Sequence, residues 1–186
     1  MCLRVWYKIL VANRGISLAF VLNSLQRCTD DIFVDASTEW GIGGCCGSDY
    51  FAYPWSKLAM FEVDVIARKE LLACLVGLHC FHEKVEGTIV TIYTDNSNVA
   101  SWLEKGRVSN NLGMRLLGAW EFQKYKLRCK VSARWLPGSH NTTADSLSRG
   151  NIPAWLARRG VEQRCNLHDI AITLSNVERS WTSFVQ

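Results

Sequence analysis

The sequence has no apolar run that could cross a bilayer, because its longest apolar stretches, such as residues 71–78, are short and interrupted. Residues 1–8 lack the basic, apolar and small-residue order of a secretory signal. Internal repeats and low-complexity tracts are absent as well. These absences favour an intracellular protein, cytoplasmic or nuclear, with no membrane partner.

A strong excess of either charge is also missing. The formal net charge is +4, and residues 29–150 carry thirteen basic and fourteen acidic side chains, whereas residues 1–28 carry four basic and no acidic ones. A broad cationic surface is therefore excluded for the central part of the chain. If the protein binds nucleic acid, its affinity must come from local basic stripes and from the flanking segments.

What the sequence does contain is enough apolar residues for a packed core, since 48% of its 186 residues are hydrophobic and 20% are charged. A chain of this size does not need disulfides for stability. Its eight scattered cysteines are therefore interpreted as reduced thiols, as in an intracellular protein. Together these features predict one domain of usual size with additional segments at its ends.

Short β-branched and aromatic runs alternate with longer helical stretches from residue 31 onward. The strand-like runs lie at 31–36, 40–46, 50–55, 88–94 and 128–135. The helical stretches lie at 63–82 and at about 97–105, 111–125 and 141–149. Three strands in succession, followed by strands alternating with helices, predict an α/β fold with a five-stranded mixed sheet and helices on both faces. This domain covers 29–150, between an N-terminal connector segment, 1–28, and a C-terminal extension, 151–186.

Four acidic residues stand in apolar surroundings, where a carboxylate is costly to bury without a partner: Asp35, Glu70, Asp95 and Asp145. Asp35 and Asp95 each follow an apolar strand, and Glu70 shares one helical face with small or apolar residues. If the two strands are parallel neighbours, their carboxyl ends bring these acids to one edge of the sheet. Carboxylates suit two Mg²⁺ or Mn²⁺ ions about 4 Å apart, an arrangement that promotes phosphodiester cleavage. The pattern therefore predicts a nuclease.

Three of the acids also have a structural interpretation. Asp95 is a preferred N-cap for the helix that follows it, and Asp145 is favoured by the helix dipole in a first turn. Glu70 could instead lie at the edge of the apolar stripe and extend to water. No single acid is specific, and only their joint placement carries the prediction.

Several segments around the acids resemble the ribonuclease H domains linked to retroelement reverse transcriptases. They are Asp35-Ala36-Ser37 with Trp40-Gly41, Glu70-Leu71-Leu72-Ala73, Thr94-Asp95-Asn96, Leu136-Pro137-Gly138-Ser139-His140-Asn141 and Ala144-Asp145-Ser146-Leu147-Ser148-Arg149. The last is particularly similar to those of long-terminal-repeat and tyrosine-recombinase retrotransposons. The resemblance covers about 29–150, and residues 1–28 resemble the connector that precedes this domain in such polyproteins.

The resemblance implies a ribonuclease H fold and a metal-dependent endoribonuclease that cleaves the RNA strand of RNA–DNA hybrids. It carries metal ligation onto the four acids, with Mg²⁺ or Mn²⁺ as the two ions. It also places His140 near a loop histidine that in many members shuttles protons or helps product leave. The partner that the resemblance implies is a reverse transcriptase polymerase domain. This chain alone should not synthesise DNA, because it has no Tyr-X-Asp-Asp sequence. The basic helix with which cellular members grip the hybrid has no counterpart, since only residues 104–109 fill that gap.

Polar residues beside the acids are the expected contacts to nucleic acid: Ser37, Asn96, Ser97 and Asn110. Their side chains can hydrogen-bond phosphates or the RNA 2′-hydroxyl. A second candidate is the run 128–135, in which Arg128, Lys130, Ser132 and Arg134 alternate with Cys129, Val131, Ala133 and Trp135. Its polar face fits either a charged edge strand or a phosphate-binding surface.

Two alternatives to the hydrolase remain open from the sequence. One is a catalytically inactive module of the same fold, which binds nucleic acid or a protein partner. The other is a DNA-cutting relative such as an integrase or a resolvase. Relatives of that kind use a sparser set of acids, and the segment 144–149 does not suggest them.

Overall fold

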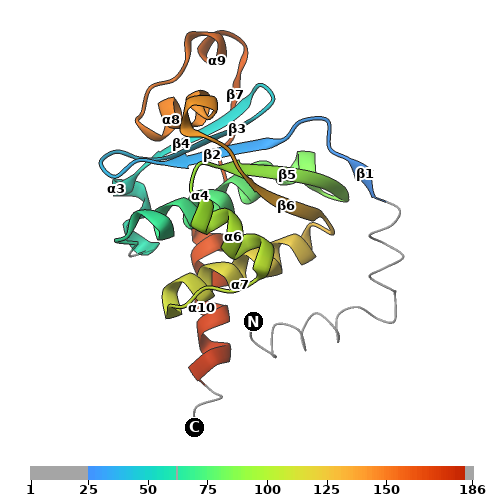
Figure 1. Cartoon of the computed structure of the whole chain (residues 1–186), viewed down its shortest axis with the longest axis vertical. Helices are drawn as coiled ribbons and strands as arrows, with labels where there is room; N and C mark the ends of the chain where they lie inside the picture. The colour runs from blue at the N-terminus through green and yellow to red at the C-terminus, as the bar shows by residue number, and fades with distance from the viewer. Residues whose placement is uncertain (1–24, 62, 183–186) are drawn as a thin grey trace.

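The computed structural model describes residues 25–61 and 63–182, and it shows a twisted mixed sheet with helices on both faces (Figure 1). Most of the expected connector, residues 1–24, lies outside the described residues. The α/β class and the mixed sheet predicted from the sequence are confirmed. None of the helices in the described ranges has the length and apolarity that crossing a membrane requires.

The centre of the sheet consists of five long strands. Strand β2 (Ile32–Ala36) is antiparallel to β3 (Gly41–Cys46), which is antiparallel to β4 (Asp49–Pro54). On its other side β2 is parallel to β5 (Thr88–Thr94), and β5 is parallel to β6 (Lys130–Trp135). The long strands are therefore ordered β4–β3–β2–β5–β6, and the strands that carry Asp35 and lead into Asp95 are parallel neighbours.

The predicted strand number was wrong, because the described residues form a sheet of seven strands rather than five. Strand β1 (Gln26–Arg27) is parallel to the beginning of β5, and β7 (Val161–Glu162) is parallel to the beginning of β4. Each additional strand has two residues. Such a short pairing leaves no alternation of apolar and polar residues in the sequence, so periodicity could not predict it.

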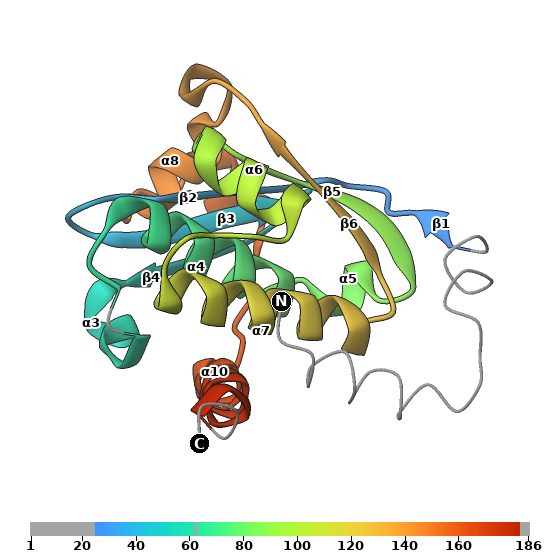
Figure 2. The ribbon, with the colours of Figure 1, turned by 60° about the horizontal axis from the view of Figure 1, so that its bottom comes forward.

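One face of the sheet carries the larger helical layer (Figures 1 and 2). Helix α4 (Ile66–Cys80) packs on β2 and β3, and α6 (Ser97–Lys105) packs on β5 and β6. Helix α7 (Asn111–Lys126) lies against α4, and α10 (Leu167–Thr182) packs on α7 and α4. The short elements α3 (Trp55–Leu58), η1 (Ala59–Phe61) and α5 (His82–Val85) complete the chain between β4 and β5.

Helix α4 is the centre of this layer, and its sequence explains why. Every residue from Glu70 to Leu78 is buried, so the helix is enclosed on all sides instead of presenting one apolar stripe. Gly77 allows it to approach the sheet, because a Cβ there would lie 2.9 Å from Cγ1 of Val34. The sheet therefore holds α4 at a short distance, which fixes the height of Glu70 above β2.

The opposite face carries a smaller layer, formed by η2 (Gly138–His140), α8 (Thr142–Ser148) and α9 (Ala154–Arg159) (Figure 1). Helix α8 packs on β2, β3 and β4. Leu147 and Leu156 form a second apolar cluster there with Cys45 and Tyr50. Residues of the C-terminal extension therefore pack on both layers, because Ile170 and Leu174 belong to the core on the α4 side.

Strands β2 and β5 separate toward their carboxyl ends. Their pairing consists of Ile32 with Ile92 and Phe33 with Tyr93. Beyond it the carbonyl oxygen of Val34 accepts a hydrogen bond from Nδ2 of Asn141, at 2.9 Å. The side chain of Asn141 is buried, so it replaces a backbone partner at the point where the two strands diverge.

Replacing Gly43 with alanine should push α8 away from the sheet, since the added methyl group would collide with the backbone of Leu147 and Ser148. We expect the free energy of unfolding to fall by about 1–3 kcal/mol, measured by urea denaturation. Amide hydrogen exchange should become faster along α8.

Gly87→Ala is the control for that experiment. Gly87 has open space around it but a φ of +69°, so alanine there should cost about 1–2 kcal/mol through backbone strain alone. Exchange along α8 should not change in this variant. Unchanged α8 exchange in Gly43→Ala would contradict the role given to Gly43.

Candidate metal centre

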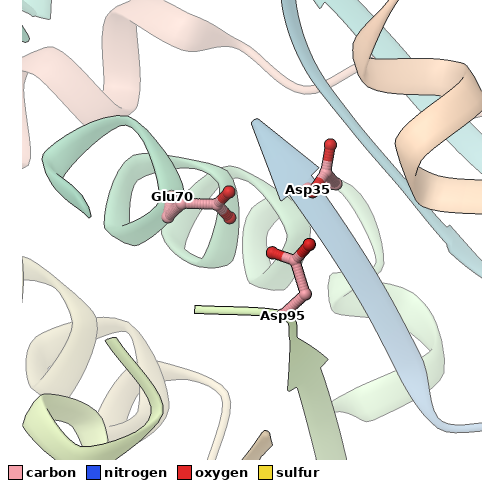
Figure 3. A group of neighbouring side chains, drawn as sticks. All are labelled: Asp35, Glu70 and Asp95. Atoms are coloured by element: carbon pink, nitrogen blue, oxygen red, sulfur yellow. The ribbon is translucent and has the colours of Figure 1, made fainter. Parts of the chain in front are cut away.

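Three of the four predicted acids meet at the carboxyl edge of the sheet (Figure 3). Asp35 comes from β2, Glu70 reaches across from α4, and Asp95 directly follows β5. One carboxylate oxygen of each lies within 4.8 Å of the others. The expectation that parallel strands bring Asp35 and Asp95 together, with a crossing helix supplying Glu70, is confirmed for these three residues.

The N-cap interpretation of Asp95 is wrong, because the neighbouring Asn96 has that role. Oδ1 of Asn96 accepts hydrogen bonds from the backbone N–H groups of Asn98 and Val99 at the start of α6. Asp95 is therefore not needed to satisfy the helix terminus. Its carboxylate instead faces Asp35 and Glu70.

Burial of two of these acids is nearly complete, with 5% of Asp35 and 3% of Glu70 exposed. The hydroxyl of Ser148 on α8 donates a hydrogen bond to Oδ2 of Asp35. The hydroxyl of Thr94 lies 3.4 Å from Oε2 of Glu70 and donates to it. Each buried carboxylate thus has a neutral hydroxyl donor, but none of these contacts is an ion pair that balances its charge.

The electrostatic consequence is that all three acids bind protons more tightly than usual. Burial, and then the neighbouring charges of Asp35 and Asp95, raise the pKa of Glu70 to about 9. Burial raises the pKa of Asp35 to about 6, against the opposing hydrogen bond from Ser148. Burial and the nearby Asp145 also raise the pKa of Asp95. A positive ion between the carboxylates would lower the electrostatic cost of ionising them.

The three side chains fit a hard divalent cation. Oxygen atoms at the 2.0–2.6 Å typical of Mg²⁺ and Ca²⁺ bonds lie at most about 4–5 Å apart around one ion, which matches the spacing of the cluster. The donors are carboxylate oxygens, and no thiol or imidazole takes part, as Mg²⁺ and Mn²⁺ require. The cluster could therefore hold a metal ion of this class.

Asp145, the fourth acid, lies in the same cleft but outside the tight group. The cleft has a volume of about 310 Å³ and is lined by Asp35, Glu70, Asp95, Asp145 and Arg149, among others. Oδ1 of Asp145 forms an ion pair with Arg149, at 2.7 Å, and 40% of the Asp145 side chain is exposed. The structure thus places Asp145 beside the cluster, with its carboxylate paired with the guanidinium group of Arg149.

The structure places two of the expected nucleic-acid contacts in the cleft and the others outside its lining. Ser37 and Asn96 line the cleft, although Ser37 Oγ also accepts hydrogen bonds from the backbone N–H groups of Trp40 and Gly41. Ser97 is exposed in the first turn of α6, and Asn110 caps α7 by accepting from the N–H of Gly113. His140 is exposed at the end of η2, outside the residues that line the cleft.

Sequence reasoning missed the residues that support the acids. Ser148 contacts Asp35 across 113 positions of sequence, and Asn141 holds the diverging strand β2. Such long-range contacts have no local signal. The Asp145–Arg149 pair did have a local signal in the sequence, because acidic and basic side chains four residues apart in a helix are neighbours.

Comparison of the chain with protein-family models and with curated proteins gives no match. The geometry described above is therefore the basis for any statement about function.

The metal-free protein should lose stability as the pH rises. Glu70 keeps its proton in the folded chain up to about pH 9, whereas in the unfolded chain it ionises near its ordinary pKa of 4.5. The folded state therefore binds more protons between these values, and the free energy of unfolding falls across the interval. Thermal unfolding in chelator from pH 5 to 9 should show the decline, and Mn²⁺ should reverse it by binding the folded state.

Glu70→Gln should flatten this pH dependence and remove most of the stabilisation by Mn²⁺, because the amide neither ionises nor ligates as a carboxylate does. Glu83→Gln, which alters an exposed glutamate on α5, is the matched control and should keep both effects. A Glu70→Gln profile that follows the wild type would show that Glu70 is not the titrating group.

Proposed function

We propose that the chain is a metal-dependent endonuclease of the ribonuclease H type, which cleaves the RNA strand of RNA–DNA hybrids. The observation that carries the proposal is the group of three nearly uncompensated carboxylates at the edge of a mixed α/β sheet. Burying such charges is costly unless a cation binds them. The segments that resemble ribonuclease H domains of retroelements are those that carry these acids and Asp145.

In this proposal Asp35, Glu70 and Asp95 hold the metal, and Asp145 contributes on the open side of the cleft. Bound Mg²⁺ or Mn²⁺, as a pair of ions, supplies activation of water and stabilisation of the charge on the leaving oxygen. Ser148 and Thr94 fix the orientation of the Asp35 and Glu70 carboxylates through their hydrogen bonds.

The open part of the cleft is where the RNA strand would lie. Arg149 lines it and 60% of its side chain is exposed, so its guanidinium can meet a phosphate while it neutralises Asp145. Ser37, Asn96 and Ser97 lie at the mouth or beside it and offer hydrogen bonds to phosphate or to the 2′-hydroxyl. Asn110, the N-cap of α7, and His140, exposed at the end of η2, lie outside the cleft lining. In this proposal Asn110 adds a contact to nucleic acid, and His140 serves in proton transfer or product release. In-line attack of water on the RNA phosphodiester would leave a 5′-phosphate and a 3′-hydroxyl.

A retroelement origin would make a reverse transcriptase polymerase domain the natural partner. The near balance of charge in residues 29–150 agrees with this, since a domain without a broad basic surface benefits from a second domain that grips the hybrid.

Asp35→Asn and Asp95→Asn should each abolish hybrid cleavage while the chain stays folded. Both changes remove ligand charge at positions where no apolar packing is lost, so the thermal unfolding temperature in chelator should not fall. Asp169→Asn, at an exposed acid on α10, is the matched control and should cut normally. Near-normal cutting by Asp35→Asn or Asp95→Asn would refute the assignment of the metal site.

The experiment that tests the function is cleavage of end-labelled RNA–DNA hybrid by the purified chain, in Mg²⁺, in Mn²⁺ and in chelator. Single-stranded RNA, duplex RNA and duplex DNA of the same sequence serve as comparisons. Metal-dependent cutting of RNA in the hybrid alone is the expected result. Cutting of duplex DNA would favour the integrase-like alternative, and metal and hybrid binding without cutting would favour the inactive module.

A further inference from the structure

Among residues 25–61 and 63–182, no helix packs on part of the sheet on the side of α8. This region, here called the β5–β6 face, consists of Thr91 and Tyr93 on β5 with Lys130, Ser132 and Arg134 on β6. The register pairs Thr91 with Ser132 and Tyr93 with Arg134, so their side chains point to the same side. The alternate residues Val90, Ile92, Val131 and Ala133 belong to the core on the α4 side.

The helices of the two layers explain why the β5–β6 face is open. Helix α8 packs on β2, β3 and β4, whereas the helices that pack on β5 and β6 belong to the other layer. In Figure 1, β5 and β6 extend beyond α8 and α9. Lys130 and Arg134 are exposed, and Thr91, Tyr93 and Ser132 are half-buried.

The face is also positively charged. Within the described ranges, neither Lys130 nor Arg134 forms an ion pair. Asp31, whose carboxylate accepts from the backbone N–H of Thr91, is paired with Arg27. The cations of the face are thus available to an anionic ligand.

An aromatic pair connects this face to the acids. The rings of Phe33 and Tyr93 are stacked, with centroids 5.0 Å apart and an interplanar angle of 14°. Phe33 precedes Asp35 by two residues on β2, so its ring lies on the same side of the strand as that acid. Tyr93 lies on β5 two residues before Asp95, which directly follows the strand. The β5–β6 face is therefore continuous with the metal centre.

We propose that the β5–β6 face binds the backbone of the nucleic acid whose cleavage is proposed above, and the inference rests on that function. Arg134 and Lys130 contact separate phosphates of one strand, and Tyr93 offers its ring to a base or sugar at the approach to the acids. A charged edge strand that only resists aggregation would not need an aromatic pair beside its cations, so this combination favours a ligand.

The dimensions agree with a nucleic-acid strand. Asp95 directly follows β5, and Arg134 on β6 pairs with Tyr93, two residues before Asp95, which corresponds to about 8 Å between Asp95 and Arg134. Lys130 lies four residues farther back, or about 13 Å. At about 3.4 Å of helix axis per phosphate of each strand, the basic pair spans about four nucleotides of a duplex that lies along β6.

The test compares the double variant Lys130→Glu/Arg134→Glu with Arg158→Glu/Arg159→Glu. The latter makes the same charge change on exposed arginines of α9, whose Leu156 packs near β4 at the opposite edge of the sheet. Affinity for labelled RNA–DNA hybrid is measured by fluorescence anisotropy in Ca²⁺ over a series of salt concentrations, and cleavage is measured separately in Mg²⁺.

We expect the β6 variant to bind the hybrid roughly tenfold or more weakly, with the slope of log affinity against log salt reduced by about two. The α9 variant should stay within about twofold of the wild type. Equal losses in both variants, no loss in the β6 variant, or no hybrid binding by the wild type would each overturn the proposal.

These outcomes are separable from the proposed function. Wild-type binding without cutting, lost in the β6 variant, would support the β5–β6 face and refute the nuclease. Normal cutting with unchanged binding in the β6 variant would support the nuclease and refute the β5–β6 face. Tyr93→Leu should weaken binding about fivefold or more while Tyr93→Phe keeps it, because the ring and not the hydroxyl makes the contact.

Discussion

Burial of neighbouring carboxylates, two of which water barely reaches, is the constraint on which the site depends. Asp35 and Glu70 are 95% or more buried, and Asp95 brings a third carboxylate oxygen within 4.8 Å of theirs. A folded chain tolerates this only by keeping protons on the acids or by binding a positive ion. The raised pKa values of Glu70, about 9, and Asp35, about 6, describe the first state, and metal binding at neutral pH would replace it.

The rest of the fold holds the acids in this costly position. Gly77 lets α4 approach β2 so that Glu70 overhangs the end of the strand, and Gly43 lets α8 approach from the other face so that Ser148 reaches Asp35. The side chain of Asn141 donates a hydrogen bond to the carbonyl oxygen of Val34 where β2 diverges from β5. This divergence opens the edge of the sheet beside Asp95. Because α8 packs on β2, β3 and β4, the side of β5 and β6 that faces the α8 layer stays uncovered next to the acids in the described part of the chain.

Local patterns in the sequence predicted much of this arrangement and missed the rest for identifiable reasons. The spacing of Glu70 on its helical face and the strand-end positions of Asp35 and Asp95 sufficed to predict their convergence. The two-residue strands β1 and β7 left no periodic signal, and the contact from Ser148 to Asp35 joins segments that only the tertiary fold brings together. Trp135 was expected on the apolar face of its strand, yet 53% of it is exposed, because it ends β6 at the margin of the core and donates its indole N–H to the carbonyl of Asp95.

The central claim is that Asp35, Glu70 and Asp95 together bind a divalent metal ion. The most direct measurement is X-ray diffraction from crystals of the chain soaked in Mn²⁺, with anomalous difference maps calculated near the manganese edge. The account predicts a strong anomalous peak between the three carboxylates that is absent in Asp35→Asn crystals. A peak elsewhere, or none at Mn²⁺ concentrations that support binding in solution, would contradict it.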